Sequence, residues 1–207
     1  MKQVVIWDDF YAEPMALRQV ALDTEYEEPG LGNYPGRNSL LKFFPDEMKE
    51  FFSFIAGERI KPVETSNCGG FRIQHKDETG KQYIHVDLPS MTTTWAGICY
   101  LSLPEHYEGI NAGSMFWKHK ETGMEQMPYD QEYLASIGIT SPNDLFKFMN
   151  TEGTDTSKWV NTFSIPIKFN RLIMFRSNLW HSQGELFGDT IENSRLIQTF
   201  FFEPDIK

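Results

Sequence analysis

Two histidines and an aspartate are the residues of this chain whose types and spacing best suit chemistry. His85 and Asp87 stand one residue apart in a stretch predicted as a strand over residues 82–87, and His181 follows 96 residues later. Side chains alternate faces along a strand, so His85 and Asp87 are predicted to point the same way. Two imidazoles and one carboxylate match a facial iron(II) site, which keeps coordination positions open for oxygen and a co-substrate. The tripeptide alone also occurs as an ordinary surface pair, so the rest of the chain has to decide.

The composition predicts one folded, β-rich domain over residues 1–207. Of the 207 residues, 40% are hydrophobic and 14% aromatic, which is enough to build a core. The 17 phenylalanines and five tryptophans favour sheets over a helical bundle, because aromatic side chains suit a pleated, half-buried surface.

Charge and cysteine usage limit the partners and the compartment. A net charge of −10 argues against a broad nucleic-acid surface, which needs clustered Lys and Arg to displace phosphate counter-ions. Cys68 and Cys99 are predicted to be buried free thiols rather than a disulfide. With no signal peptide and no apolar run of membrane length, the chain is predicted to be cytoplasmic and not to associate with a membrane.

Short strands dominate the chain after about residue 60. Strands are predicted at 62–67, 70–76, 82–87, 95–103, 113–117, 158–164, 171–176 and 195–203, a succession typical of a sandwich or jelly roll. Residues 1–60 are predicted to hold an N-terminal strand at 2–7, buttressing helices at 14–23 and 45–56, and an ordered loop at 25–40.

A long polar insertion interrupts the strands at residues 118–157. Two short helices are predicted in it, at 128–137 and 142–150, the second with Ser141 as its N-cap. A compact domain rarely keeps an insertion of this length without a use, so it is predicted to be a mobile lid that sets substrate choice. The alternative is a static helical decoration.

Further motifs follow the histidine–aspartate pair in a fixed order. They are Tyr100-Leu101-Ser102, Ala112-Gly113-Ser114, Asn170-Arg171-Leu172-Ile173-Met174-Phe175, Trp180-His181-Ser182 and Arg195-Leu196-Ile197-Gln198-Thr199. In this order the chain resembles the Fe(II)/2-oxoglutarate-dependent dioxygenases, and most of all the prolyl-hydroxylase-like branch with its small microbial and viral relatives. The resemblance covers about residues 60–203, and the N-terminal helices more loosely. The usual Gly-Gly turn is Ala112-Gly113 here, and thirteen residues separate His181 from Arg195, more than in the closest hydroxylases.

The resemblance implies a fold, a site and an activity. The fold would be mainly β with flanking helices, a double-stranded β-helix (jelly roll) whose open end holds the metal. His85, Asp87 and His181 would bind Fe(II), while Arg195 and the Tyr100 hydroxyl would meet the distal carboxylate of 2-oxoglutarate. Arginine suits that carboxylate because its planar fork can make two charge-assisted hydrogen bonds. The implied reaction consumes O2 and hydroxylates a substrate with release of succinate and CO2, without catalytic side chains beyond the metal ligands.

Other functions stay open at this point. The main alternative is a catalytically silent jelly-roll module that binds a peptide or a sugar, although such a module has little reason to keep the whole ligand set and Arg195. Halogenation is disfavoured, because halogenases of this kind replace the carboxylate with a small residue and Asp87 is present. His75, His106 and His119 are predicted to be exposed or hydrogen-bonded rather than ligands. A free amino acid, a protein side chain, a nucleobase and a small metabolite all fit as substrate, although the acidic surface argues against nucleic acid.

Overall fold

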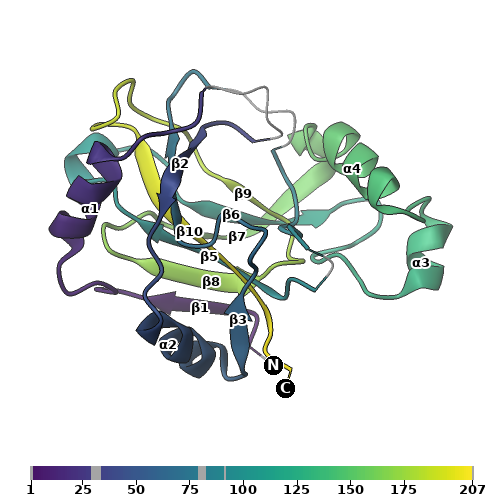
Figure 1. The fold of residues 1–207 in the computed structure, drawn as a ribbon. Helices are drawn as coiled ribbons and strands as arrows, with labels where there is room; N and C mark the ends of the chain where they lie inside the picture. The colour runs from purple at the N-terminus through teal and green to yellow at the C-terminus, as the bar shows by residue number, and fades with distance from the viewer. Residues whose placement is uncertain (1, 29–33, 79–82, 91, 207) are drawn as a thin grey trace.

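The computed structural model describes residues 2–28, 34–78, 83–90 and 92–206 (Figure 1). The strands are β1 (Val4–Trp7), β2 (Arg37–Lys42), β3 (Ile60–Pro62), β4 (Gly70–Gln74), β5 (Trp95–Tyr100), β6 (Ser114–His119), β7 (Trp159–Ile165), β8 (Leu172–Arg176), β9 (His181–Gln183) and β10 (Arg195–Pro204). The α-helices are α1 (Pro14–Asp23), α2 (Glu47–Ala56), α3 (Gln131–Ser136) and α4 (Pro142–Thr151). The described part of the chain is therefore mostly β with few helices, as predicted.

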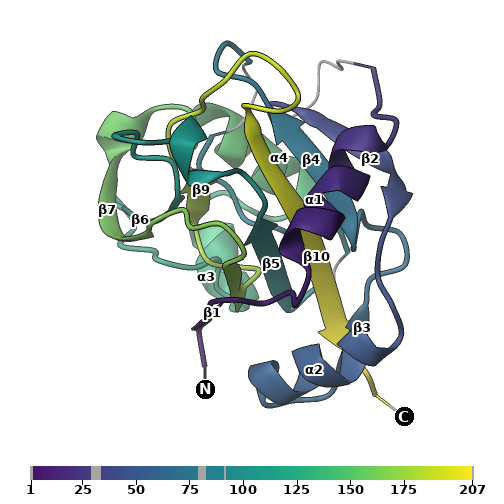
Figure 2. The ribbon, with the colours of Figure 1, turned by 90° about the vertical axis from the view of Figure 1, so that its left-hand side faces the viewer.

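The strands form two antiparallel sheets. The larger has the order β1-β8-β5-β10-β4-β2, with β3 also paired to β10, and the smaller has the order β7-β6-β9. Figure 2 shows the two sheets side by side, with β10 crossing the larger one between β5 and β4. Strand β10 is the last of these strands in sequence, yet it lies in the interior of the larger sheet. The strands on its two sides can therefore join into one sheet only when β10 pairs with both of them.

The central strand β10 separates two environments by its period-two alternation. Residues 196, 200 and 202 belong to a hydrophobic cluster on the helix side of the sheet. Residues 195, 197, 199 and 201 line a cavity on the other side. One strand thus supplies both a core face and a site face.

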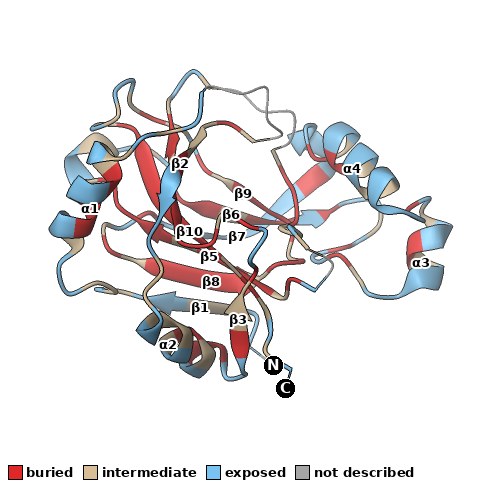
Figure 3. Cartoon of the chain, in the orientation of Figure 1, coloured by how far each residue is buried: buried red, intermediate tan, exposed pale blue. Residues whose placement is uncertain are grey.

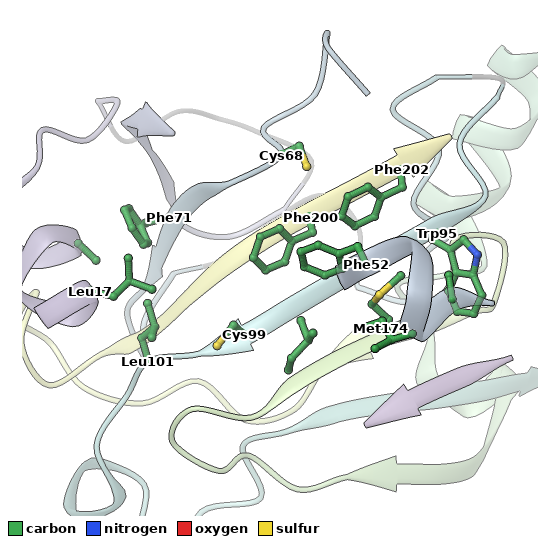
Figure 4. Packing of buried hydrophobic residues seen from close by; sticks show 14 of the residues in the cluster. Leu17, Phe52, Cys68, Phe71, Trp95, Cys99, Leu101, Met174, Phe200 and Phe202 are labelled. Atoms are coloured by element: carbon green, nitrogen blue, oxygen red, sulfur yellow. The ribbon is translucent and has the colours of Figure 1, made fainter. Parts of the chain in front are cut away.

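Helices α1 and α2 pack against the first of these faces. Figure 4 shows Phe52 of α2 beside Phe200 and Phe202 of β10, with ring centroids 4.8 and 4.6 Å apart. Leu17 of α1 joins the same cluster. Such aromatic burial is the main stabilising term of a sheet–helix layer. Gly57 ends α2 in the left-handed conformation, with φ +77°, which glycine adopts without strain.

Two further hydrophobic clusters lie on the cavity side of the larger sheet. One joins the two sheets and includes Phe116 of β6 and Phe175 of β8, whose ring centroids are 5.4 Å apart. The other joins residues of the 118–157 insertion to Ile84 and Val86, the neighbours of the predicted ligands. Figure 3 shows burial concentrated along β5, β8 and β10, while the outer faces of α3 and α4 are exposed.

The structure corrects the predicted strand over residues 82–87, of which residue 82 lies outside the described residues. The described part, 83–87, forms no ladder and begins in a bend at residues 83–84. Its one bridge joins His85 to His181, whereas Ile84 donates its N–H to Gly153 O and Asp87 donates to Ser177 O. Because successive residues bond to three different segments, no continuous pairing can form. His85 and Asp87 nevertheless point toward the same place.

Other bounds also differ from the prediction: the strand predicted at 95–103 ends at Tyr100, the helix predicted at 128–137 is α3 (Gln131–Ser136), and the short strand β9 was not predicted. The described part of the 25–40 loop contains the start of β2, while residues 29–33 lie outside the described residues. The strand predicted at 62–67 ends at Pro62, because Ser66 and Gly70 fold the chain into turns by donating to Val63 O and Asn67 O. Helix α1 has the predicted bounds, and the Ser141 side chain caps α4 as predicted.

Two predictions drawn from composition can be compared with the structure. Cys68 and Cys99 are both buried and free, as predicted. None of the helices in the described ranges has the length and apolar character needed to traverse a bilayer.

Candidate metal centre

His85, Asp87 and His181 converge on one point in spite of their separation in sequence. One potential ligand atom from each residue lies within 4.8 Å of the others. His181 Nε2 lies 3.2 Å from Asp87 Oδ2, and His85 Nε2 lies 3.6 Å from Asp87 Oδ1. The described residues contain no other comparable cluster of three His, Cys, Asp or Glu side chains. The three predicted ligands are therefore brought together by the fold.

The main chain fixes the spacing of the two histidines. His85 N–H donates to His181 O, and His181 N–H donates to His85 O, both at 2.9 Å. This reciprocal pair places the two rings side by side, with centroids 4.4 Å apart. Asp87 is held in turn by its N–H, which donates to Ser177 O at 2.8 Å. The side-chain cluster therefore rests on backbone hydrogen bonds.

Both imidazoles present the same nitrogen to the cluster. His85 Nδ1 lies 2.8 Å from Tyr83 O and His181 Nδ1 lies 2.8 Å from Leu179 O. A carbonyl oxygen can only accept, so each Nδ1 carries a proton, and Nε2 offers a lone pair when it carries none. A backbone partner of this kind on the far ring nitrogen is what fixes metal-binding histidines in proteins.

Burial and neighbouring charges shift the pKa values of His85 and Asp87 so that both side chains offer acceptor atoms. Burial, and then the charge of His181, lower the pKa of His85 to about 4, so its ring is neutral at pH 7. Burial alone would raise the pKa of Asp87, but the charge and hydrogen bond of His181 outweigh it and leave the pKa below its usual range. When neither Nε2 carries a proton, both nitrogens and the carboxylate are acceptors that converge on one point, and they repel each other unless a cation lies between them. The donor set therefore fits a divalent metal ion.

Arg195 is a buried guanidinium beside this centre. It is 2% exposed, its Nη1 donates to Gln74 Oε1, and its Nε has no partner among the described residues. Its guanidinium carbon lies 5.7 Å from the centroid of the Tyr100 ring, and no carboxylate contributes to its electrostatic surroundings. An unpaired buried charge is costly, so this side chain fits an anionic ligand.

Tyr100 keeps its proton beside that arginine. Burial raises the pKa of the Tyr100 hydroxyl, whose oxygen lies 2.8 Å from Ser114 Oγ. The Tyr100 hydroxyl contacts Ser114, which lines the cavity beside Arg195, whereas Tyr100 itself is not among the residues that line it. The Arg195 guanidinium and the Tyr100 ring thus lie close together, and their roles toward a co-substrate stay a prediction.

A cavity of about 240 Å³ joins the metal centre to Arg195. It lies on the inner face of β4, β10 and β5, and its lining includes the three predicted ligands, Arg195, Gln74, Arg72 and Tyr34. A second, more open hollow of about 660 Å³, lined by residues 104–105, 107–112 and 166–167, includes none of the predicted site residues.

Sequence reasoning missed three residues of the cavity wall, Arg72, Gln74 and Tyr34. Arg72 and Gln74 alternate with Phe71 and Ile73 along β4, so period-two alternation could have predicted a polar face on this strand. Tyr34 gave no such pattern. Its ring lies 4.3 Å from the His85 ring, and burial followed by the charge of Asp87 raises the pKa of its hydroxyl.

The 118–157 insertion contacts both segments that carry the predicted ligands. Gly153 O accepts from Ile84 N–H at 2.9 Å, and Met127 N–H donates to Asn178 O at 2.7 Å. Glu125 O accepts from the N–H of Trp180, the residue before His181. A side chain at position 153 would meet Ile84 O at 2.2 Å, so glycine is needed for this approach. The insertion therefore packs against the backbone segments that carry His85 and His181.

The remaining histidines have partners or positions outside the centre. His75 is hydrogen-bonded to Ser194 Oγ at 2.6 Å. His119 is buried rather than exposed, and its ring nitrogens meet Thr122 Oγ1 at 2.9 Å and Glu152 Oε2 at 3.3 Å. His106 lies in the short 3-10 turn Pro104–His106.

Comparison of the sequence with family models places the chain in a family. The model of the family described as "Family of unknown function (DUF6445)" matches residues 1–202. The chain belongs to that family. No curated protein matches the sequence.

Two solved structures illustrate the fold that this chain shares with known proteins. HygX from Streptomyces hygroscopicus, solved with nickel, 2-oxoglutarate and hygromycin B, is 15% identical with a TM-score of 0.52, covering 99% of this chain and 84% of HygX. SnoK, a non-heme alpha-ketoglutarate-dependent carbocyclase from nogalamycin biosynthesis, is 12% identical with a TM-score of 0.54, covering 98% and 80%. At this identity the likeness shows that the DUF6445 chain shares their fold.

Proposed function

We propose that this DUF6445 protein is an Fe(II)- and 2-oxoglutarate-dependent oxygenase that hydroxylates a substrate with release of succinate and CO2. The observation that carries the proposal is the set of converging acceptors on His85, Asp87 and His181, joined by one cavity to the uncompensated charge of Arg195. The fold shared with HygX and SnoK supports it. A double-stranded β-helix and the prolyl-hydroxylase-like branch are part of the proposal, supported by the two antiparallel sheets and by the order of the motifs.

In this proposal the protein binds, orients and excludes water. Nε2 of His85, Nε2 of His181 and the Asp87 carboxylate would hold the ion, and a ferrous ion there would supply the oxygen activation that side chains cannot. Arg195 would bind the distal carboxylate of 2-oxoglutarate, with the Tyr100 hydroxyl as a second donor. Phe175, which lines the cavity with its ring centroid 4.5 Å from that of His181, would keep bulk water from this side of the centre.

The test is metal and co-substrate binding followed by turnover. Purified protein should bind Ni(II) and, in its presence, 2-oxoglutarate; with Fe(II) and O2 it should form succinate. Asp87→Ala should lose metal binding and succinate formation while it unfolds at a similar temperature, because the carboxylate lies at the cavity and not in a hydrophobic cluster. Lys118→Ala, which removes an exposed charge outside the cavity, is the matched control.

The outcomes separate the two functions that the sequence left open. Binding of metal and 2-oxoglutarate without succinate under any substrate mixture would leave the silent binding module for a peptide or sugar. Failure of the wild-type protein to bind a divalent metal would remove the proposal altogether. A cytoplasmic location and a substrate that is a small molecule or a protein side chain, without nucleic acid or membrane partners, remain proposals from the composition.

A further inference from the structure

Arg72 is a second guanidinium in the cavity, and neutral groups alone hold it. Its Nε and Nη2 donate to Pro35 O at 3.1 and 2.6 Å, Nη2 also donates to Tyr34 O at 3.1 Å, and Nη1 donates to Asn38 Oδ1 at 2.6 Å. Four of its five N–H groups are therefore used, and one on Nη1 remains. None of the ion pairs among the described residues includes Arg72, and Glu78 and Glu27 act on its charge only through space.

Arg72 and Arg195 lie close together on the same face of the sheet. Arg72 pairs across the ladder with Ile197, two residues from the pair between Gln74 and Arg195. All four residues line the cavity. Burial, and then the positive charge of Arg195, lower the pKa of Arg72. Two positive charges thus share one cavity wall, and neither forms an ion pair with a carboxylate of the described residues; Glu78, Glu27 and Asp87 act on Arg72 only through space.

The charges of the loaded site leave one of these arginines uncompensated. This step rests on the proposed function. A divalent ion and Arg195 are balanced by the dianion 2-oxoglutarate and by Asp87, because both histidine rings bind metal in their neutral form. No charge of the metal ion, of 2-oxoglutarate or of Asp87 is then left to balance Arg72. Its guanidinium lies in a partly desolvated cavity, where an unpaired charge is costly.

We propose that Arg72 binds a carboxylate group of the substrate, and that the substrate is a small carboxylic acid. The free N–H of Arg72 and its single positive charge match one carboxylate. A phosphate ester would instead carry about two negative charges near neutral pH. Arg72 also holds Tyr34 O, and the Tyr34 ring lies against His85. A carboxylate at Arg72 would therefore orient the rest of the acid toward the metal centre.

The test measures acid against amide on the loaded protein. Wild-type protein saturated with Ni(II) and 2-oxoglutarate is titrated calorimetrically with butyrate, hexanoate and 4-methylpentanoate, and with the primary amide of each. At least one acid should bind at least tenfold more tightly than its amide. Arg72→Met should abolish that preference, and Arg72→Lys should keep part of it, because lysine keeps the charge without the fork.

Two controls assign the effect to Arg72. Arg37→Met removes a positive charge from the neighbouring strand β2, outside the cavity lining, and should leave the preference unchanged. The affinity for 2-oxoglutarate should stay within about twofold in Arg72→Met, while a large loss would show that Arg72 serves the co-substrate and would overturn the assignment. Should Arg72→Met not fold, the wild-type acid–amide comparison and Arg72→Lys still decide.

Failure of this inference differs from failure of the proposed function. If Ni(II) and 2-oxoglutarate bind but every acid binds no better than its amide, or none binds at millimolar concentration, the carboxylate site is wrong and the oxygenase proposal stands. If Ni(II) or 2-oxoglutarate does not bind, the oxygenase proposal fails first.

Discussion

The proposed role of Arg195 follows from its burial without a carboxylate partner among the described residues. Its guanidinium is nearly inaccessible, contacts Gln74 and Tyr100, and meets no carboxylate in the described ranges. A structural arginine at this depth would ordinarily be paired, because breaking a buried pair is strongly destabilising. The uncompensated charge is therefore better explained by a ligand than by stability.

Replacing Arg195 with Met should raise the 2-oxoglutarate requirement by about ten- to a hundredfold. A lost charge-assisted hydrogen bond costs about 1.5–3 kcal/mol, which corresponds to that range of affinity. The melting temperature should change much less, because a buried unpaired charge is removed at the same time. Titration of 2-oxoglutarate into the Ni(II) protein measures the effect, with Arg176→Met as control for a cation outside the cavity. An unchanged affinity would assign the co-substrate to another group.

The three candidate ligands could be predicted from residue types, but the residues that line the cavity around them could not. The spacing of His85 and Asp87 and the later His181 carried enough pattern to name the set. Tyr34 carries no pattern, because its place against His85 depends on a long-range contact held by Arg72. Such contacts between distant segments have no local sequence correlate.

At the scale of elements, Gly153 is the point where the insertion and the predicted ligand segment touch. Gly153→Ala would place a methyl group 2.2 Å from Ile84 O and 2.6 Å from Met149 O, both backbone atoms. We expect a loss of about 1–3 kcal/mol of stability, as for overpacking, together with an approximately tenfold or greater loss of metal affinity. Chemical denaturation and Ni(II) titration measure the two effects.

Gly138→Ala is the matched control within the same insertion. Gly138 has φ +82° and no neighbouring atoms within 4 Å of an added methyl group, so the substitution strains the backbone by about 1–2 kcal/mol without contacting the centre. Its metal affinity should be unchanged. If both variants lose metal affinity equally, the insertion acts through general stability and not through the Ile84 contact.

Asp8 fastens strand β1 to the turn before β8. Its carboxylate accepts from Arg171 Nε at 2.6 Å and Nη2 at 3.0 Å, and from Lys168 Nζ at 2.9 Å. The hydrogen bonds from Arg171 and then Lys168 hold the pKa of Asp8 far below its ordinary value of 3.8. The group therefore stabilises the fold above pH 3.8, and this contribution is lost as the pH falls through the folded pKa.

Asp8→Asn should accordingly cost about 0.5–1 kcal/mol at pH 7, after allowance for the 35% exposure of the carboxylate. The difference between wild type and variant should shrink as the pH falls below 3.8. Urea unfolding at a series of pH values tests this, with Asp9→Asn as the neighbouring control. A difference independent of pH would contradict the ion pair as its source.

Helices were easier to predict than strand pairings, for physical reasons. The α1 bounds follow from Pro14 and the apolar spacing after it, and the α4 cap follows from Ser141, all local features. Residues 83–87 look like a strand in composition, but their partners at Gly153, Ser177 and His181 are set by the fold. Strand β2 was missed because Leu40 and Leu41 lie exposed at a sheet edge, where the hydrophobic alternation is lost.

Over the whole molecule, the insertion has two parts of different character. Met124, Met127 and Met149 belong to the hydrophobic cluster behind the centre, whereas the outer surfaces of α3 and α4 are exposed and lie on the side opposite α1 (Figure 1). The mobile lid remains a prediction. The contacts behind the centre indicate that any motion would involve α3 and α4 more than residues 124–127 and 149–153.

Hydrogen exchange should detect that motion. With Ni(II) and 2-oxoglutarate bound, amides of residues 130–148 should exchange more slowly than in the free protein, and those of β5 and β10 should not change. Protection at 118–157 equal to that of the core strands in both states would show a static decoration. Slower exchange throughout the molecule would indicate general stabilisation by the ligands instead.

The reciprocal hydrogen bonds between His85 and His181 have a consequence for how the protein would bind the proposed metal ion. They close a loop of 96 residues, and closing a loop of about that length removes roughly 4–5 kcal/mol of chain entropy. This chain entropy is already lost when the protein folds. The binding energy of a metal ion would therefore not be needed to bring the two histidine segments together. The metal-free protein should therefore survive chelation as a folded, reloadable form, able to exchange one divalent ion for another without passing through an unfolded state.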